Sequence, residues 1–244
     1  MRHSTYLRYE LLRTFRNRRF MILSLGFPLV LYFLIAAPNR NAQSIGGSGI
    51  AAPLYFMVSL AAFGCMNAVI SAGGRIANER VVGWTRQLRL TPLSTRMYFR
   101  TKVLTGYAMA LCTLALLYIA GTTLGVHLSI GHWLHMTEFI LIGLIPFAVL
   151  GILLGHLLNV ESIGPTLGGV TALFAFLGGV WFPITSGVLH DIAQALPSYW
   201  LVQAAHVGLG GNGWGTRGWV VDAAWSAGLA ALAVRAYRRD TARS

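Results

Sequence analysis

Six long apolar runs limit this chain to one class of fold. A helix rises about 1.5 Å per residue and the hydrocarbon layer of a membrane is about 30 Å thick, so each span needs roughly 20 mostly apolar residues. Only 11% of the residues are charged, against about 25% in soluble domains. The sequence therefore predicts an all-α integral membrane protein, with a single transmembrane domain over residues 1–244. The six predicted transmembrane helices are 20–37, 53–73, 103–126, 137–158, 165–182 and 219–237.

The basic residues predict how these helices are oriented. Of the 19 basic residues, all but Arg40 and Arg217 fall at the N-terminus, between 75 and 102, or at the C-terminus. Because cytoplasmic segments collect lysine and arginine, we expect a multi-pass membrane protein with both termini in the cytoplasm. The lipid bilayer then accounts for the net charge of +12, and no nucleic-acid partner is expected. The first apolar run, at 18 residues, exceeds a signal-peptide core and is expected to be retained.

Two segments outside the runs are also expected to meet the membrane. Residues 1–19 place apolar side chains between arginines at spacings of mostly three and four, which is typical of an amphipathic interfacial helix. A basic tail that only sets orientation is the alternative. Residues 183–218 are too short and broken for two further spans, yet too apolar for a solvated loop. They predict one or two short re-entrant helices that dip into the outer leaflet.

The motifs of catalysis are missing from the sequence. There is no P-loop of the form GxxxxGK(S/T), no HExxH and no GxSxG, so we expect no catalytic residue and no ATPase activity in this chain. His132, His135 and Glu138 have a spacing that could gather metal ligands, but an interfacial cluster beside Trp133 is favoured and no metal site is expected. Cys65 lies in an apolar run, as does Cys112, which favours inert packing.

Ion-coupled transport is disfavoured, because it usually leaves ionisable residues at membrane depth. The middle of the predicted bundle offers only mild polarity, carried by Ser59, Asn67 and Ser71 in the second span. The Asn67 side chain could form a hydrogen bond between two helices or face a transported molecule. We therefore take these three residues as the candidate substrate path.

A polar, arginine-rich island, residues 78–94, separates the second and third apolar runs. At 100° per residue Val81, Trp84 and Leu88 share one side of a helix, and Arg86 and Arg89 point away from it. Pro92 then ends the helix. The pattern predicts a short helix parallel to the membrane; an amphipathic loop that only anchors orientation is the alternative.

The island also resembles a known motif. The run Asn78-Glu79-Arg80, Gly83-Trp84 and Arg86-Gln87-Leu88-Arg89-Leu90-Thr91-Pro92-Leu93-Ser94, with Tyr98 and Lys102 beyond it, is similar to the cytoplasmic motif of type-2 ATP-binding-cassette (ABC) transporter permeases. The similarity is to the drug-resistance export class, and within it to small six-span actinobacterial members. Many relatives have Gly and Thr adjacent, whereas Trp84 separates Gly83 from Thr85 here. The glutamate-alanine-alanine loop of importers is absent.

A second stretch supports the resemblance. Its residues are Gly178-Gly179, Trp181-Phe182-Pro183, Ile192-Ala193 and Leu196-Pro197-Ser198-Tyr199, which resemble the family's pattern between its fifth and sixth spans. In that family this segment forms re-entrant helices. Trp181, Pro183, Pro197 and Tyr199 are the candidate residues of the outer segment.

The resemblance implies a permease subunit of an ATP-driven exporter that moves an amphiphilic drug, lipid or natural product, with multidrug or antibiotic resistance as its class. It implies a cytoplasmic ATPase subunit that binds ATP and Mg, and a second permease copy, in a homodimer or in a heterodimer with a sibling. A non-transporting anchor or sensor that recruits an ATPase is the alternative.

By the same resemblance, residues 78–94 are the coupling helix between spans 2 and 3. Glu79, Arg86 and Arg89 would make polar contacts with the ATPase, and Trp84 and Leu88 would anchor the helix. Gly83 would allow close approach, and Thr91 and Pro92 would set the angle of the third span. Asn78 and Gln87 complete the set of predicted coupling residues.

Overall fold

The computed structural model describes residues 3–84, 87, 90–91, 93–209 and 213–242. Every regular element in these ranges is a helix, which confirms the predicted all-α class. The N-terminal elements are α1 (His3–Arg16), α2 (Arg18–Met21), the π-helix η1 (Ile22–Gly26) and α3 (Phe27–Ala36). They are followed by α4 (Ala52–Val81), α6 (Thr95–Thr123), α7 (Ile130–Gly143), α8 (Ile145–Leu157), α9 (Val160–Leu177), α10 (Val188–Ala193), α11 (Pro197–Val207) and α12 (Thr216–Ala242).

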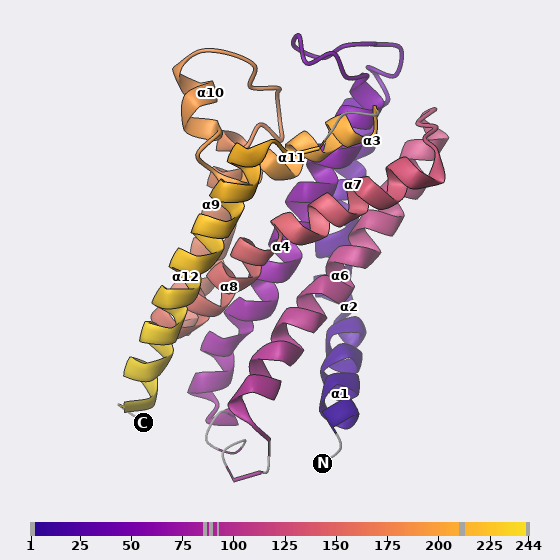
Figure 1. Cartoon of the computed structure of the whole chain (residues 1–244). Coiled ribbons are helices and arrows are strands. Elements are labelled where there is room, and N and C mark those ends of the chain that lie inside the picture. Colours follow the sequence, from indigo (N-terminus) through magenta and orange to yellow (C-terminus); the bar gives the residue numbers. More distant parts are fainter. Residues whose placement is uncertain (1–2, 85–86, 88–89, 92, 210–212, 243–244) are drawn as a thin grey trace.

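Five helices in the described part of the chain are long and apolar enough to cross a membrane. They are α4, α6, α7 continued by α8, α9 and α12, and they coincide with the second to sixth predicted spans. The first predicted span, 20–37, falls on a shorter apolar helix, Ile22–Ala36. A count of six crossings therefore stays a prediction. Both termini lie at the same end of the bundle (Figure 1).

Helix boundaries differ from the predicted ones where caps or polar turns decide them. α4 continues to Val81, well past the predicted residue 73, because its last two turns are polar but still packed. α7 begins at Ile130, where the Ser129 side chain accepts the His132 N–H. α9 begins at Val160 and ends at Leu177, so the predicted 178–182 lie outside it; Gly179, with φ of +81°, turns the chain there.

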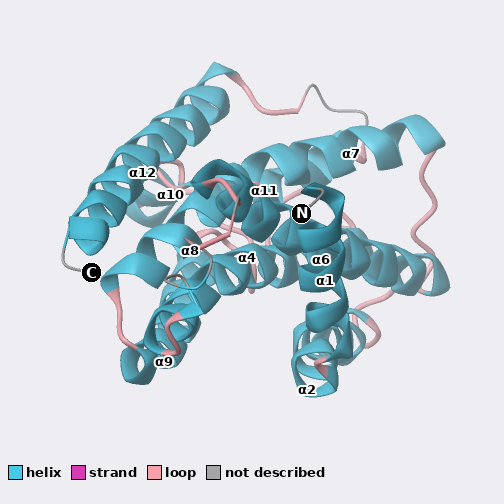
Figure 2. Ribbon diagram, turned by 90° about the horizontal axis from the view of Figure 1, so that it is seen from below, coloured by secondary structure: helices cyan, strands magenta, loops and turns pink. Residues whose placement is uncertain are grey.

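The long helix α4 forms the centre of the bundle, and 83% of its most apolar 18-residue stretch is buried. It packs against α3, α6, α8, α9 and α11, whereas α9 and α12 lie at the periphery (Figures 1 and 2). The segment predicted to dip into the outer leaflet contains two short helices, α10 and α11, at the end away from the termini. α11 is packed against α4 and α7, with Leu201 and Ala204 fully buried.

Glycines allow α4 and α8 to approach with their backbones in contact. A Cβ on Gly151 would lie 2.5 Å from the Ile70 carbonyl oxygen, and one on Gly155 would lie 2.6 Å from the Gly73 carbonyl oxygen. A Cβ on Gly73 would overlap the backbone of Gly151 itself. The small-residue spacing of Gly151 and Gly155 therefore marks a true helix contact. Gly164 and Gly168, a similar pair on α9, meet nothing within 4 Å in this chain.

We expect Gly151→Ala to destabilise the protein by about 1 to 3 kcal/mol, because the added methyl group must push two backbones apart. Gly228→Ala on α12 is the matched control, since a Cβ there meets nothing within 4 Å. Thermal unfolding in detergent, followed by tryptophan fluorescence, measures both. Equal melting temperatures for the two variants would contradict the backbone contact.

Candidate functional site

The connection between α4 and α6 lies at the end of the bundle that carries the termini (Figure 1). α4 ends at Val81, and Gly83, with φ of +69°, donates its N–H to the Arg80 carbonyl oxygen at 3.2 Å. That left-handed conformation favours glycine, which explains its place directly after the helix. At the far side of the connection the Ser94 side chain caps α6 by accepting the Met97 N–H.

The surface of this connection is unusually apolar. Val81 and Val82 are 73% and 71% exposed, Leu90 is 90% exposed, and Trp84 is 36% exposed. Asn78, Gln87 and Thr91 are exposed beside them. Of the predicted coupling residues, Arg86, Leu88, Arg89 and Pro92 lie outside the described residues. Among the described residues, Val81, Val82, Trp84 and Leu90 therefore form an exposed apolar patch.

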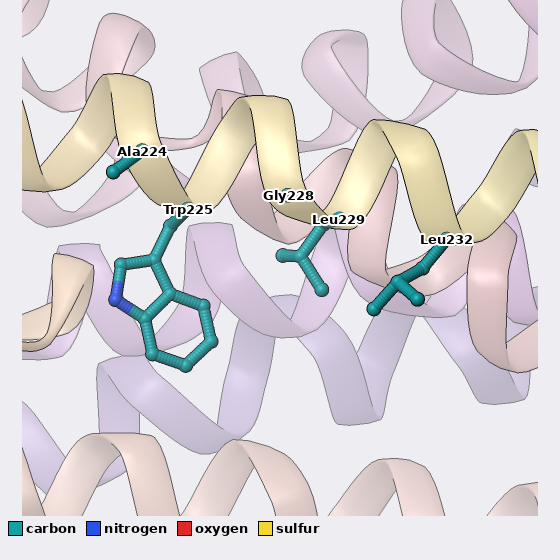
Figure 3. A pocket seen from close by; sticks show the side chains of 5 residues that line it. All are labelled: Ala224, Trp225, Gly228, Leu229 and Leu232. Atoms are coloured by element: carbon teal, nitrogen blue, oxygen red, sulfur yellow. The ribbon is translucent and has the colours of Figure 1, made fainter.

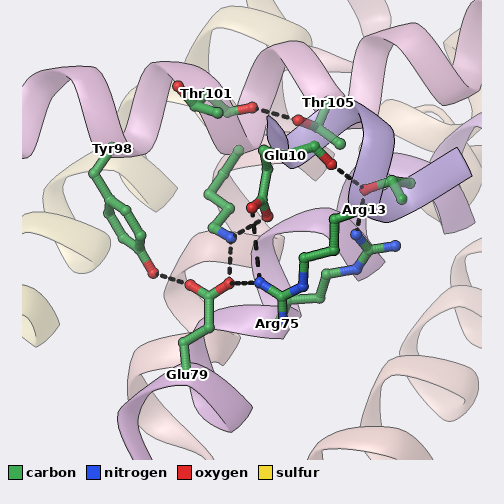
Figure 4. A network of polar contacts seen from close by, with 9 residues as sticks. Glu10, Arg13, Arg75, Glu79, Tyr98, Thr101 and Thr105 are labelled. Carbon is green, nitrogen blue, oxygen red and sulfur yellow. Dashed lines mark hydrogen bonds and ion pairs between the residues drawn. The ribbon is translucent and has the colours of Figure 1, made fainter. Parts of the chain in front are cut away.

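Glu79 was predicted to contact the ATPase subunit at the surface, but its side chain is only 2% exposed in this chain. One carboxylate oxygen lies 2.5 Å from the Lys102 ammonium and 3.2 Å from the Arg13 guanidinium. The other oxygen accepts a hydrogen bond from the Tyr98 hydroxyl at 2.6 Å. Figure 4 shows Arg13 of α1 and Tyr98 of α6 pointing toward Glu79 of α4. The structure thus places Glu79 inside the chain, where it joins three helices.

The Lys102 ammonium is shared by two carboxylates. It lies 2.7 Å from Glu10 of α1 as well as 2.5 Å from Glu79 of α4, and its own side chain is 1% exposed. Nearby, Arg75 donates to the Thr14 hydroxyl at 2.6 Å, which ties α1 to α4 a second time. Buried charges of opposite sign with hydrogen bonds to their remaining atoms satisfy one another and fix the geometry. The end of α4 is therefore held to α1 and α6.

Arg80, the next residue, holds the same end of α4 to two other helices. Its guanidinium lies 2.7 Å from Asp240 of α12 and donates to the His156 carbonyl oxygen of α8 at 2.8 Å. The His156 ring lies 3.0 Å from Asp240 and packs edge-on against Phe99 and Tyr237. Adjacent helical residues point about 100° apart. Glu79 and Arg80 thus divide the surrounding helices between them.

The helix α1 buries polar residues and exposes apolar ones. Glu10 and Thr14 face the bundle and are buried, as is Tyr6, whereas Leu12 and Phe15 are 45% and 40% exposed. Burial raises the pKa of the Tyr6 phenol; the charges of Glu10 and Glu79 raise it further, while Trp84 and Arg13 oppose the rise. A helix with this distribution suits a surface between protein and membrane, as predicted for residues 1–19. Its placement in the interface stays a prediction.

The candidate substrate path is not continuous on the surface of this chain. Ser59 is fully buried, and the partly exposed Asn67 accepts a hydrogen bond from the Ser71 hydroxyl at 3.4 Å. Asn67 and Ser71 therefore share one face of α4, while Ser59 lies within the packed bundle.

The candidate outer residues surround the turn after α9. Trp181 packs against Phe63 of α4, and Pro197 begins α11. The Tyr199 ring makes edge-to-face contacts with Trp200 and His190. Pro183 lies against Gly46 in the loop before α4. Of these four residues, Pro183 and Tyr199 line a cavity of about 260 Å³, together with Tyr55, whose hydroxyl donates to the Gly179 carbonyl oxygen. Among the described residues, no group of three histidine, cysteine or acidic side chains could hold a metal.

The sequence model of the ABC-2 type transporter family matches residues 3–209, nearly the whole chain. The chain is also similar to YvfS of Bacillus subtilis (strain 168), described as a candidate transport permease. The two are 28% identical over 200 residues, which cover 78% of each protein.

We expect Lys102→Met to destabilise the protein by about 3 to 5 kcal/mol, because it leaves two carboxylates buried without their cation. Arg13→Gln is the control, since the Arg13 side chain is 58% exposed and its loss should cost at most about 1 kcal/mol. The double variant Glu79→Gln, Lys102→Met should recover part of the loss. Thermal unfolding in detergent measures all three; no recovery in the double variant would contradict the pairing.

Proposed function

This chain belongs to the ABC-2 type transporter family, and on that premise we propose that it is the membrane-spanning permease subunit of an ATP-driven exporter. The observation that carries the proposal is the apolar patch Val81, Val82, Trp84 and Leu90 at the α4–α6 connection. Exposed apolar side chains grouped in this way mark a surface for a partner. We assign this surface to the cytoplasmic ATPase subunit, which would bind ATP and Mg.

The ion pairs beneath the patch suit a coupling element. A partner that moves the connection also moves the end of α4, and Glu79 and Arg80 hold that end to α1, α6, α8 and α12. Closure of an ATPase dimer could in this way bias the whole bundle between inward-open and outward-open states. In this proposal Glu79 transmits the movement from inside the chain, and the exposed Asn78, Gln87 and Thr91 supply polar contacts outside it.

A second permease copy completes the proposed exporter. α9 has only 17% of its apolar window buried, and Gly164 and Gly168 leave one of its faces open to close approach. We propose that this face lies at the interface of a homodimer, or of a heterodimer with a sibling permease, in a bacterial plasma membrane with both termini in the cytoplasm. The chain would cross the membrane six times, with Ile22–Ala36 as the first crossing.

The proposed cargo is an amphiphilic drug, lipid or natural product. The α4 face that carries Asn67 and Ser71 offers mild polarity among apolar residues, and no described acidic or basic side chain forms an ion pair there. The short helices α10 and α11 would dip into the outer leaflet and border the exit. A non-transporting anchor subunit is the competing function, and transport into vesicles by the purified permease and ATPase pair distinguishes the two.

We expect Trp84→Ala, and Val82→Ser beside it, to lower association with the ATPase subunit about tenfold or more, as loss of a central interface side chain does. Val188→Ser is the matched control, because Val188 is 77% exposed at the opposite end of the bundle. Copurification and ATPase stimulation in detergent measure the effect. Unchanged binding together with unchanged stimulation would remove the patch from the interface.

Asn67→Leu should lower export severalfold, because it removes the amide from the proposed path. Ser59→Ala is the control, since Ser59 is fully buried and should leave export unchanged. Efflux of fluorescent amphiphiles from cells that carry each variant provides the comparison. If every tested compound leaves at the wild-type rate in the Asn67 variant, this residue does not line the path.

A further inference from the structure

One face of α12 carries an apolar stretch that ends on two arginines. Ala224, Gly228, Leu232, Arg235 and Arg239 follow one another at spacings of three and four, so they form a single row along the helix. All five are exposed. A neighbouring face, which includes Ala233 and Ala236, is buried where α12 packs on α8. The row therefore points away from the rest of this chain.

The apolar stretch is a groove of about 320 Å³ lined by Ala224, Trp225, Gly228, Leu229 and Leu232. In Figure 3 the side chains of Trp225, Leu229 and Leu232 point to the same side of the helix, and Gly228 leaves a gap between them. A Cβ on Gly228 would meet no atom within 4 Å. Trp225 closes one end, where its ring packs against Phe174 of α9. A groove lined by these apolar side chains suits a hydrocarbon chain.

A basic hollow of about 370 Å³ follows on the same helix, lined by Ala231, Val234, Arg235, Arg238 and Arg239. Arg235 lies seven residues after Gly228, or about 10 Å along the axis. None of the seven acidic side chains of the chain, all of them in its described part, forms an ion pair with Arg235 or Arg239. Asp240, the nearest in sequence, is held by Arg80 and His156.

We propose that this face of α12 binds one anionic phospholipid of the leaflet on the side of the termini. An acyl chain lies in the groove beside Gly228, and the phosphate lies between the guanidinium groups of Arg235 and Arg239. Guanidinium groups bind phosphate through paired hydrogen bonds. A phospholipid carries its phosphate directly beside its acyl chains, so one molecule can fill the apolar groove and reach the two arginines that follow it. The proposal depends only on membrane insertion, so it can fail while the proposed function holds.

The test is native mass spectrometry of the full-length chain in detergent, with phosphatidylglycerol compared with phosphatidylcholine of the same acyl chains. The wild-type protein should retain phosphatidylglycerol preferentially. Arg235→Gln with Arg239→Gln should reduce this retention about tenfold or more, since each basic residue near anionic lipid contributes about a factor of five. Gly228→Leu, which fills the groove while keeping both arginines, should also reduce it severalfold.

The matched control is Arg96→Gln with Arg100→Gln, which removes the same charge from exposed positions on α6. An equal loss of phosphatidylglycerol in this control would overturn the site in favour of a general charge effect. Wild-type retention in both α12 variants would also overturn it. If Gly228→Leu instead splits a dimer by light scattering, the occupant is a second copy; if the double α12 variant loses only ATPase binding, the occupant is the ATPase subunit.

Discussion

The buried ammonium of Lys102 is the contact on which the cytoplasm-side end of this bundle depends in our proposal. The carboxylates of Glu10 in α1 and Glu79 in α4 both lie within 2.7 Å of this ammonium, although the two residues are far apart in the sequence. Each of the three charges would be costly to bury alone, and the departure of α6 would leave two carboxylates without their shared cation. The pairing therefore makes α1, α4 and α6 behave as one unit at this end.

Uncharged backbone contacts hold α4 in the middle of the bundle. There the backbones of α4 and α8 touch through Gly73, Gly151 and Gly155, and no polar side chain is needed. In lipid, close backbone packing replaces the hydrophobic effect as the force between helices. α4 is thus fixed by glycine contacts within the apolar layer and by charge at its end. In our proposal, a movement at the end of α4 is transmitted along the helix through these contacts.

The sequence predicts the helices much better than it predicts these contacts. Five apolar runs predicted long apolar helices because length and hydropathy alone decide whether a segment can span. The predicted helix ends are wrong where a capping side chain determines the boundary. The Ser129 side chain, for example, caps α7 several residues before the predicted apolar run begins. The island 78–94 was recognised by its composition. Glu79, however, was expected outside, since nothing in the local pattern shows that Lys102 and Glu10 would meet it.

The division of labour between Glu79 and its neighbours has a physical logic. A surface that must bind a partner reversibly is better built from apolar side chains, because breaking such a contact leaves no unpaired buried charge. A junction that must not separate is better built from buried charges with complete pairing. The structure has the apolar patch on the outside of the α4–α6 connection and the ion pairs directly beneath it. In our proposal, force applied to the patch reaches a junction that resists separation, which is the arrangement a coupling element needs.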